Sequence, residues 1–203
     1  MNRLYEKIAL FGCGGHSRSV ADIVLSNNPH VLLVFVDPNA RLSEKIYGFP
    51  VMKECPDGSL PIFLAIGDNK IRKEKFEELS SANIISVLSC KAHIGYGSIL
   101  DVGCFVGNFC HIGPDVVIGE NSIINNGAIV EHEVIIGRHS HVGPNATISG
   151  RCKIGNQVFV GVGATIKDYV TICSDVIIGA GATVVHPIEE PGVYVGTPAK
   201  RIK

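Results

Sequence analysis

Residues 128–143, AIVEHEVIIGRHSHVG, place one histidine between two glutamates and two more histidines within the next nine residues. A histidine beside a carboxylate is suited to general-base chemistry, because an imidazole with an ordinary pKa of ~6.5 exchanges a proton near neutral pH. The same residue types bind metal ions, and they also occur on ordinary surfaces. The segment therefore raises three hypotheses, and the elements that carry it must decide among them.

Composition excludes several classes of function. The 203 residues are 46% hydrophobic, which is enough for one large core or two small ones, and the 18 basic and 19 acidic residues give a formal charge of -1 without long runs of either sign. We therefore expect no nucleic-acid partner. The longest apolar run, VLLVFV at 31–36, is far shorter than the roughly 20 residues of a membrane span, and the apolar start IALF is too short for a signal peptide. These features predict a cytoplasmic protein without membrane insertion.

The seven cysteines are odd in number and lack any Cys-x-x-Cys pair, which predicts reduced thiols and no metal site.

A six-residue repeat fills the second half of the chain. Every sixth residue from Ile94 to Val184 is aliphatic, and the position four residues further on is always small or valine. A helix cannot keep this period, whereas a solenoid of short strands and turns can. Three of the cysteines, Cys104, Cys110 and Cys152, occupy the small position and are expected to point into the core.

The hexad pattern resembles the left-handed parallel β-helix of the hexapeptide acyltransferases, in which three hexads form one triangular coil. That resemblance implies about five coils from the fifteen hexads counted in the sequence, stacked at the usual strand spacing of ~4.8 Å. His132 and Glu133 are the third and fourth residues of their hexad, so we expect both at a corner of the coil. His139 falls at the same kind of corner and is expected on the surface, and His111 has no assigned role.

The pattern before residue 90 is different. Strands are expected at 7–12, 31–37, 61–67 and 83–89, and helices at 18–26 and 68–80. Alternating strands and helices predict a small parallel, Rossmann-like α/β sheet. We therefore divide the chain into an α/β domain at 1–88 and a β-helix domain with a C-terminal tail at 89–203.

A glycine-rich turn, GCGGHS, follows the first expected strand. Gly14 and Gly15 would let a phosphate approach the start of a helix, but Ser17 stands where a dinucleotide fingerprint needs its third glycine, so NAD binding is not supported. Two interpretations stay open for the turn: a phosphate site or only a tight turn. His16 lies in this turn beside the carboxyl end of a strand, where ligands of open α/β sheets collect. Asp37, which ends the next strand, either accepts hydrogen bonds from a nucleoside or terminates the strand.

With both halves in view, the chain resembles the bacterial sugar O-acyltransferase family that includes sialic acid O-acetyltransferases and the bacillosamine-pathway acetyltransferase. The resemblance covers nearly the whole chain and rests on GCGGHSRSVADI, AIGDNKIRKE, NNGAIVEHEVIIGRHSHVG and VYVGTPAKRI, in that order. It implies an N-terminal domain that binds a nucleotide sugar and a β-helix that binds acetyl-CoA between neighbouring subunits of a homotrimer. Apolar outer residues such as Phe105, Ile123 and Ile135 are expected to supply the trimer faces.

The resemblance also assigns roles to single residues. His132 matches the catalytic base and Glu133 its partner. The implied acetyl-CoA site comprises Asn125, His141, Gly150, Val162 and Ala180, with the amide of Gly150 facing the carbonyl oxygen. The implied nucleotide-sugar site comprises Gly14, Gly15, His16, Asp37, Ile66 and Gly67.

The chemistry expected of such a site is direct acyl transfer. An amine attacks the thioester while His132 removes its proton, and Glu133 holds the imidazole in the useful tautomer. The predicted activity is acetyl-CoA-dependent N-acetylation of a nucleotide-linked 4-amino-4,6-dideoxy sugar, with O-acetylation of a sialic-acid-like sugar as the alternative. The sequence leaves the nucleotide open among UDP, dTDP and GDP.

Three other functions fit the repeat less well. A γ-type carbonic anhydrase needs two zinc histidines five residues apart, and no two histidines here have that spacing. A sugar nucleotidyltransferase would carry a much larger N-terminal domain with a basic phosphate loop. A purely structural β-helix would not need the Glu-His-Glu segment or a nucleotide-binding first domain.

Overall fold

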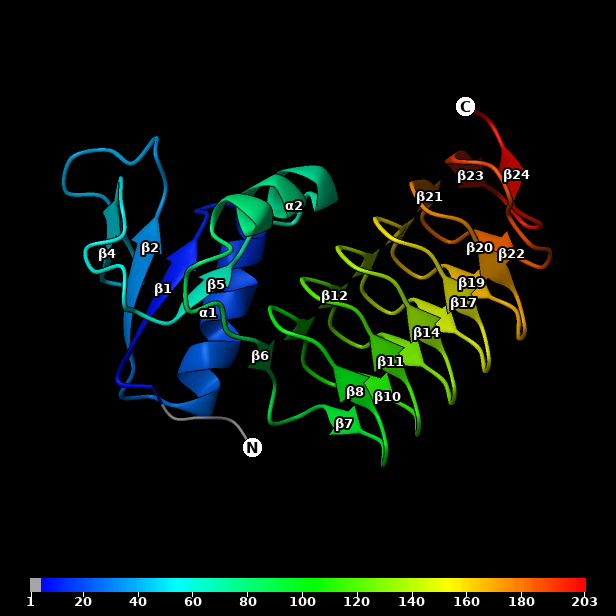
Figure 1. Cartoon of the computed structure of the whole chain (residues 1–203), viewed down its shortest axis with the longest axis horizontal. Helices are drawn as coiled ribbons and strands as arrows, with labels where there is room; N and C mark the ends of the chain where they lie inside the picture. Colours follow the sequence, from blue (N-terminus) through cyan, green and yellow to red (C-terminus); the bar gives the residue numbers. More distant parts are fainter. Residues whose placement is uncertain (1–4) are drawn as a thin grey trace.

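The computed structural model describes residues 5–203, and it consists of an α/β domain followed by a long solenoid (Figure 1). The helices and strands of the α/β domain are β1 (Lys7–Phe11), α1 (Gly15–Asn27), β2 (Leu32–Val36), β3 (Lys45–Ile46), β4 (Phe49–Met52), β5 (Ile62–Leu64) and α2 (Asn69–Glu78). The strand order is β3-β4-β2-β1-β5, and β4, β2, β1 and β5 run parallel. The predicted parallel sheet is therefore confirmed. The short antiparallel hairpin of β3 and β4 is an addition that the sequence pattern did not indicate.

The solenoid is a left-handed parallel β-helix with three faces. The eight-stranded face comprises β6 (Val87–Leu88), β9 (Phe105–Val106), β12 (Ile123–Ile124), β15 (His141–Val142), β18 (Phe159–Val160), β21 (Val176–Ile178), β23 (Gly192–Val195) and β24 (Lys200–Arg201). The six-stranded face comprises β7 (His93–Ile94), β10 (His111–Ile112), β13 (Ile129–Val130), β16 (Thr147–Ile148), β19 (Thr165–Ile166) and β22 (Thr183–Val184). The five-stranded face comprises β8 (Ile99–Leu100), β11 (Val117–Ile118), β14 (Ile135–Ile136), β17 (Lys153–Ile154) and β20 (Thr171–Ile172).

Strands on one face are separated by three hexads. Ile112 pairs with Val130, and Val130 pairs with Ile148, so residues 18 apart lie one above the other. The five- and six-stranded faces follow the predicted repeat, whereas the eight-stranded face extends beyond it through β6, β23 and β24. The aliphatic and small positions point to the axis, and Cys104, Cys110 and Cys152 are buried there with 0, 2 and 0% exposure. All seven cysteines are free thiols.

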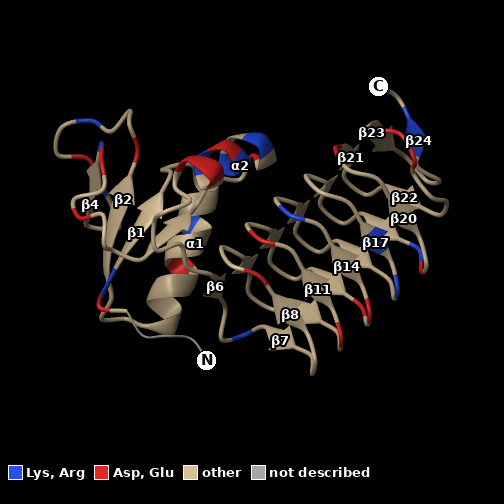
Figure 2. Cartoon of the chain, viewed as in Figure 1, with Lys and Arg blue, Asp and Glu red and all other residues tan. Residues whose placement is uncertain are grey.

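Three sets of stacked turns form the corners of the triangle. We call the turns that join the six-stranded to the five-stranded face the His132 corner, those that join the five-stranded to the eight-stranded face the His139 corner, and those that join the eight-stranded to the six-stranded face the Asn125 corner. Figure 2 shows charged residues on α2 and on turns of the solenoid, while the solenoid strands are largely uncharged. The charged turns belong to the His132 and His139 corners, whereas the turns of the Asn125 corner between residues 107 and 182 have no charged residue. No helix in the part of the chain that the structure describes is long and apolar enough to cross a membrane.

The α/β domain lies on the eight-stranded face, and the buried guanidinium of Arg72 on α2 holds it there. Arg72 donates to the carbonyls of Asn121, His139 and Ser140 in the solenoid, and to the carbonyls of Ile66 and Gly67 at the end of β5. Burial lowers the pKa of Arg72 to about 10, so the group stays charged at neutral pH. One cation thus joins the loop after β5 to the His139 corner.

Apolar packing completes the junction and corrects one expectation. Phe105 and Ile123 are 0 and 1% exposed, because they pack into the core of the α/β domain. They are therefore not available as trimer faces of the solenoid, whereas Ile135 is 46% exposed. The last strand expected in the α/β domain is shared: Ile84 bridges to Ile62, while β6 pairs with β9 of the solenoid.

Candidate active site

His132 lies in the turn between β13 and β14, and its side chain is 42% exposed. Nδ1 of His132 is 3.0 Å from Oε2 of Glu133. A carboxylate only accepts, so Nδ1 carries the hydrogen and Nε2 of the neutral ring holds the free lone pair. The pair therefore presents a basic nitrogen at an open corner.

Glu133 has a second partner, Arg151, one coil further along the same corner. Nη2 of Arg151 is 2.8 Å from the same oxygen, Oε2, and Nη1 is 2.6 Å from the hydroxyl of Tyr169 in the next coil. The hydrogen bonds from His132 and then Arg151 lower the pKa of the Glu133 carboxyl. The motif did not indicate Arg151 or Tyr169, but the steps of 18 residues from Glu133 to Arg151 and from Arg151 to Tyr169 are a signal that the repeat contains.

Gly150 lies beside the ring of His132. A Cβ placed on Gly150 would come 2.6 Å from Nε2 of His132, so a side chain at this position would displace the ring. The structure thus brings together His132, Glu133 and Gly150. The role of the Gly150 amide toward a carbonyl oxygen stays a prediction.

Asn125 and His141 form a second pair. Nδ2 of Asn125 is 3.1 Å from Nε2 of His141, and Nδ1 of His141 is 3.2 Å from the carbonyl oxygen of Gly67. Because that carbonyl can only accept, Nδ1 donates to it and Nε2 accepts from the Asn125 amide. His141 is 8% exposed, and burial, together with the Arg72 charge, lowers its pKa to about 4. Its position is therefore fixed by both domains.

His139 is not on the surface, contrary to expectation. It is 5% exposed, its Nδ1 is 2.9 Å from Nδ2 of Asn121, and its ring meets Phe76 of α2 edge-on at 5.6 Å between centroids. Burial lowers its pKa. The α/β domain covers the His139 corner and leaves the His132 corner open.

The six residues assigned to the nucleotide sugar all line one cavity of about 400 Å³ in the α/β domain, namely Gly14, Gly15, His16, Asp37, Ile66 and Gly67. The cavity lies at the carboxyl ends of β1, β2 and β5, where parallel sheets collect ligands. Nε2 of His16 is a buried nitrogen without a hydrogen-bond partner among the described residues. Burial, followed by the nearby His141 and Arg72, lowers the pKa of His16 to about 3, which keeps the imidazole neutral.

The glycines of this turn differ in backbone conformation and in the space available for a side chain. Gly12 has φ +109° and makes the sharp turn, whereas Gly14 has φ -74° and no heavy atom lies within 4 Å of a Cβ placed on Gly14 or Gly15. Neither backbone strain nor packing explains the last two glycines, which favours open access to the start of α1. Ser17 is buried and its hydroxyl donates to the carbonyl of Gly14. Oδ1 of Asp37 accepts from the amide of Asn39, which agrees with the strand-ending interpretation of this residue.

The predicted acetyl-CoA residues fall on two different corners. Val162 and Ala180 stack one coil apart on the Asn125 corner, where the amide of Gly181 donates to the carbonyl of Val162. Gly150 lies on the His132 corner, across the six-stranded face. One chain therefore does not bring Gly150 and His132 together with Asn125, Val162 and Ala180.

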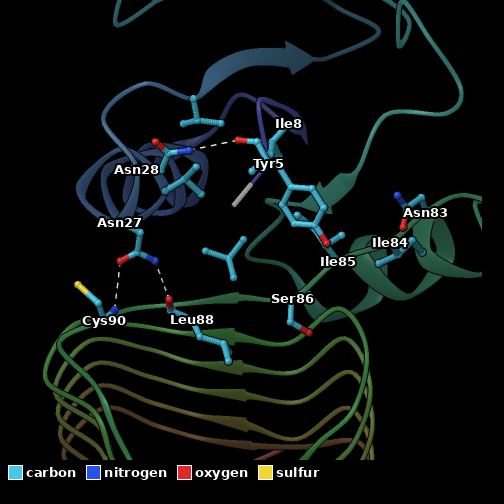
Figure 3. A pocket seen from close by; sticks show the side chains of 13 residues that line it. Tyr5, Ile8, Asn27, Asn28, Asn83, Ile84, Ile85, Ser86, Leu88 and Cys90 are labelled. Carbon is cyan, nitrogen blue, oxygen red and sulfur yellow. Dashed lines mark hydrogen bonds between the residues drawn. The ribbon is translucent and has the colours of Figure 1, made fainter. Parts of the chain in front are cut away.

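A larger cavity, of about 770 Å³, lies at the junction of the two domains and contains none of the predicted site residues (Figure 3). Two of the asparagine side chains that line it bind the backbone. Asn27 donates to the carbonyl of Leu88 and accepts from the amide of Cys90, and Asn28 donates to the carbonyl of Tyr5. These bonds favour a role in holding the junction together. Among residues 5–203, no group of three His, Cys, Asp or Glu side chains is placed to hold a metal ion.

Two family models match the sequence: PglD N-terminal domain over residues 7–79, and bacterial transferase hexapeptide over residues 103–132 and 151–186. These matches place a PglD-type N-terminal domain before hexapeptide repeats, in the same order as the α/β domain and the solenoid. A comparison with curated protein sequences finds no match.

Several solved structures are similar over nearly the whole chain. The acetyltransferase domain of PglB from Neisseria gonorrhoeae FA1090, in complex with acetyl coenzyme A, is 28% identical with a TM-score of 0.90, covering 97% of this chain and 99% of that one. PerB from Caulobacter crescentus, in complex with CoA and GDP-perosamine, is 29% identical with a TM-score of 0.86, covering 97% of each chain. WeeI from Acinetobacter baumannii AYE is 22% identical with a TM-score of 0.89, covering 96% of this chain and 99% of that one, and supports the fold alone.

Proposed function

We propose that this protein transfers the acetyl group of acetyl-CoA to the amine of a nucleotide-linked 4-amino-4,6-dideoxy sugar, with His132 as the general base. The observation that carries the proposal is the His132–Glu133 pair, which holds a basic nitrogen over Gly150 at an open corner. The similar structures support the two substrates, since one holds acetyl coenzyme A and another holds CoA with GDP-perosamine.

The reaction follows from this geometry. The sugar amine attacks the thioester carbonyl, Nε2 of His132 takes a proton from the nitrogen, and the carbon–sulfur bond then breaks to release CoA. Glu133 stabilises the imidazolium that forms. Burial raises the pKa of Cys104 to about 12 and that of Cys110 to about 11, so these thiols are poor nucleophiles. Direct attack without an acyl-enzyme is therefore the simplest route.

The cavity of the α/β domain is the proposed nucleotide-sugar site. Gly14 and Gly15 leave the start of α1 open, where backbone amides and the helix dipole favour phosphate. The side chain of His16 lines the same cavity, and its Nε2 is buried there without a hydrogen-bond partner among the described residues. These features favour the ligand interpretation of the glycine turn over a turn alone.

A complete site needs more than one subunit in this proposal. His132 and Gly150 border one edge of the six-stranded face, and Asn125, Val162 and Ala180 border the other. In a closed three-fold ring, the His132 corner of one copy meets the Asn125 corner of the next. A homotrimer therefore unites the base with the remaining acetyl-CoA residues.

The test is release of free thiol from acetyl-CoA in the presence of UDP-, dTDP- and GDP-linked amino and hydroxy sugars. We expect turnover with an amino sugar and not with its hydroxy counterpart, and the nucleotide that gives the fastest turnover identifies the nucleotide of the acceptor sugar. Turnover with hydroxy sugars or sialic acids alone would replace N-acetylation by the O-acetylation alternative. Tight sugar binding without thiol release would overturn the enzyme proposal.

A further inference from the structure

The His132 corner carries a column of residues at equivalent positions of successive coils. Glu133, Arg151 and Tyr169 are each separated by 18 residues and have φ of 58°, 62° and 62°. This shared left-handed backbone directs the three side chains outward along one line. The contacts along the column are Tyr169 to Arg151, Arg151 to Glu133, and Glu133 to His132.

We propose that Arg151, held by Tyr169, is a positioning residue that fixes Glu133 and thereby the orientation and protonation of the His132 base. This inference rests on the proposed function for its kinetic consequences and on the geometry for its structural ones. Arg151 lies outside the set of residues that the sequence motif assigned to catalysis.

The geometric argument begins with exposure. The side chain of Glu133 is 47% exposed, so a single bond to His132 leaves it free to rotate away into water. Nη2 of Arg151 binds Oε2 at 2.8 Å, the same oxygen that His132 contacts at 3.0 Å. Two donors on one oxygen restrict the carboxylate to the rotamer that also serves the imidazole.

Arg151 is itself restrained. Its Nη1 lies 2.6 Å from the hydroxyl of Tyr169, and its guanidinium carbon lies 5.4 Å from the centroid of the Tyr169 ring. An arginine that stacks on an aromatic ring while it donates from two nitrogens loses most of its freedom. The column is thus a relay of fixed side chains that ends at the base.

The charge of Arg151 has a separate effect. With Arg151 present, the charges of Glu133 and Arg151 balance, so protonation of His132 takes the group of three from neutral to positive. Without Arg151 the same protonation neutralises an isolated carboxylate, which is easier. The other charged residues of the same and adjacent turns are Glu131, Asp115 one coil before Glu133, and Lys167 and Asp168 one coil after Arg151, and all of them are unchanged in the Arg151 variants. Removal of Arg151 must therefore make His132 easier to protonate.

The test uses Arg151→Gln in the full-length protein, with Arg138→Gln as the matched control. Arg138 is also an exposed corner arginine that pairs with a glutamate one coil earlier, Glu120 at 3.4 Å, but it lies on the His139 corner. We expect Arg151→Gln to lower kcat roughly two- to fivefold, in line with the modest strength of exposed ion pairs. The acid limb of kcat/KM against pH should move to higher pH. Arg138→Gln should change neither.

Two further variants separate the parts of the relay. Arg151→Lys keeps the positive charge, so its pH profile should match that of the wild-type enzyme. Its kcat should stay below the wild-type value, because a single ammonium group cannot reproduce the guanidinium that binds both Glu133 and Tyr169. Tyr169→Phe keeps the ring and removes the hydroxyl, so it should give a smaller loss in kcat than Arg151→Gln.

An NMR titration of the His132 ring protons gives a readout that needs no turnover. The midpoint should rise in Arg151→Gln and stay unchanged in Arg138→Gln. If wild-type enzyme shows turnover that depends on His132, but Arg151→Gln matches Arg138→Gln in both kinetics and titration, the relay is refuted and the proposed function stands. If wild-type enzyme shows no acetyl transfer, the proposed function fails, while the NMR midpoint still decides whether Arg151 controls the imidazole.

Discussion

The imidazole of His132 and the carboxylate of Glu133 meet on a turn whose side chains lie outside the solenoid core. The proposed base can therefore be removed without a cavity. We expect His132→Ala to lower kcat/KM about 10²- to 10⁴-fold, the usual contribution of a general base, with an unchanged melting temperature. Glu133→Ala should lose less, since an imidazole keeps its basicity without a partner. Steady-state kinetics with circular dichroism measure both effects, and a folded His132→Ala enzyme that keeps over about a third of wild-type kcat/KM rules out this mechanism.

His16 and Asp37 border the cavity of the α/β domain, away from the His132 corner. Alanine at either position should raise the KM of the nucleotide sugar far more than the KM of acetyl-CoA, because groups that bind substrate and transition state alike act mainly on KM. Measuring both KM values for His16→Ala and Asp37→Ala tests whether this cavity binds the nucleotide sugar. Equal effects on both substrates would show that this cavity does not hold the sugar.

The histidines also show which residue assignments the sequence could support. Glu133 and His139 are both fourth residues of their hexads and both have a left-handed backbone, with φ of 58° and 57°. The repeat makes the three corners equivalent in sequence, so a pattern of six residues predicts a corner but not what covers it. Contact with Phe76 and Asn121 buries His139, and that contact depends on how the α/β domain sits on the solenoid.

At the level of strands and helices, the periodic part of the chain was the most predictable. A buried aliphatic residue at every sixth position requires one repeated strand and turn, and the register of Ile112, Val130 and Ile148 follows from it. The hairpin of β3 and β4 was not predicted, since two residues of one strand and a Pro-containing partner give no alternating pattern. The contact between the two domains could not be predicted either. Arg72 lies on a highly charged helix, so its sequence context indicates a surface residue, yet its side chain is 1% exposed in the structure.

Burial of histidines at this junction makes stability depend on pH. The pKa of His16 is lowered to about 3 and that of His141 to about 4, from 6.5 in the unfolded chain, in both cases mainly by burial. Below pH 6.5 the unfolded chain therefore binds protons that the folded chain does not. Stability is fully present above pH 6.5 and is lost as pH falls toward 4 and 3.

The expected loss is about 1.4 kcal/mol per pH unit for each histidine that is protonated only on unfolding. Urea unfolding between pH 7 and pH 5 measures it. His16→Gln should reduce the slope, whereas substitution of the exposed His30 by glutamine should leave it unchanged. The same slope in wild-type and His16→Gln protein would contradict the assignment of buried, neutral imidazoles.

On the scale of the whole molecule, the α/β domain packs on the first coils of the eight-stranded face, where Phe105 and Ile123 are buried, and leaves the other two faces exposed. The six-stranded face lies between the His132 and Asn125 corners, so it must face the neighbouring copies if these corners are to meet. Ile129, at its centre, is 37% exposed, and Ile135 on the five-stranded face is 46% exposed. A closed trimer would bury Ile129, and the role of Ile135 as a trimer contact stays a prediction.

We expect sedimentation to show a trimer at micromolar concentration. Ile129→Glu should dissociate it without unfolding the coil, because the side chain points away from the axis and a charge at a buried interface is costly. Leu42→Glu is the control, since Leu42 is 99% exposed in a loop of the α/β domain. A stable wild-type monomer would exclude the trimer, and an intact Ile129→Glu trimer would place the interface on another face.

Subunit mixing tests whether the active site is shared between copies. His132→Ala removes the base on one corner, and His141→Ala removes a residue that Asn125 contacts on the other. If each site combines the His132 corner of one copy with the Asn125 corner of the next, random mixing of the two variants gives roughly a quarter of sites with both residues intact. Activity should therefore reappear when the two low-activity variants are denatured together and refolded as mixed trimers, and separate refolding should not restore it. If the site lies within one chain, no mixed trimer contains an intact site, so mixtures that stay at the level of the separate variants would refute the shared site.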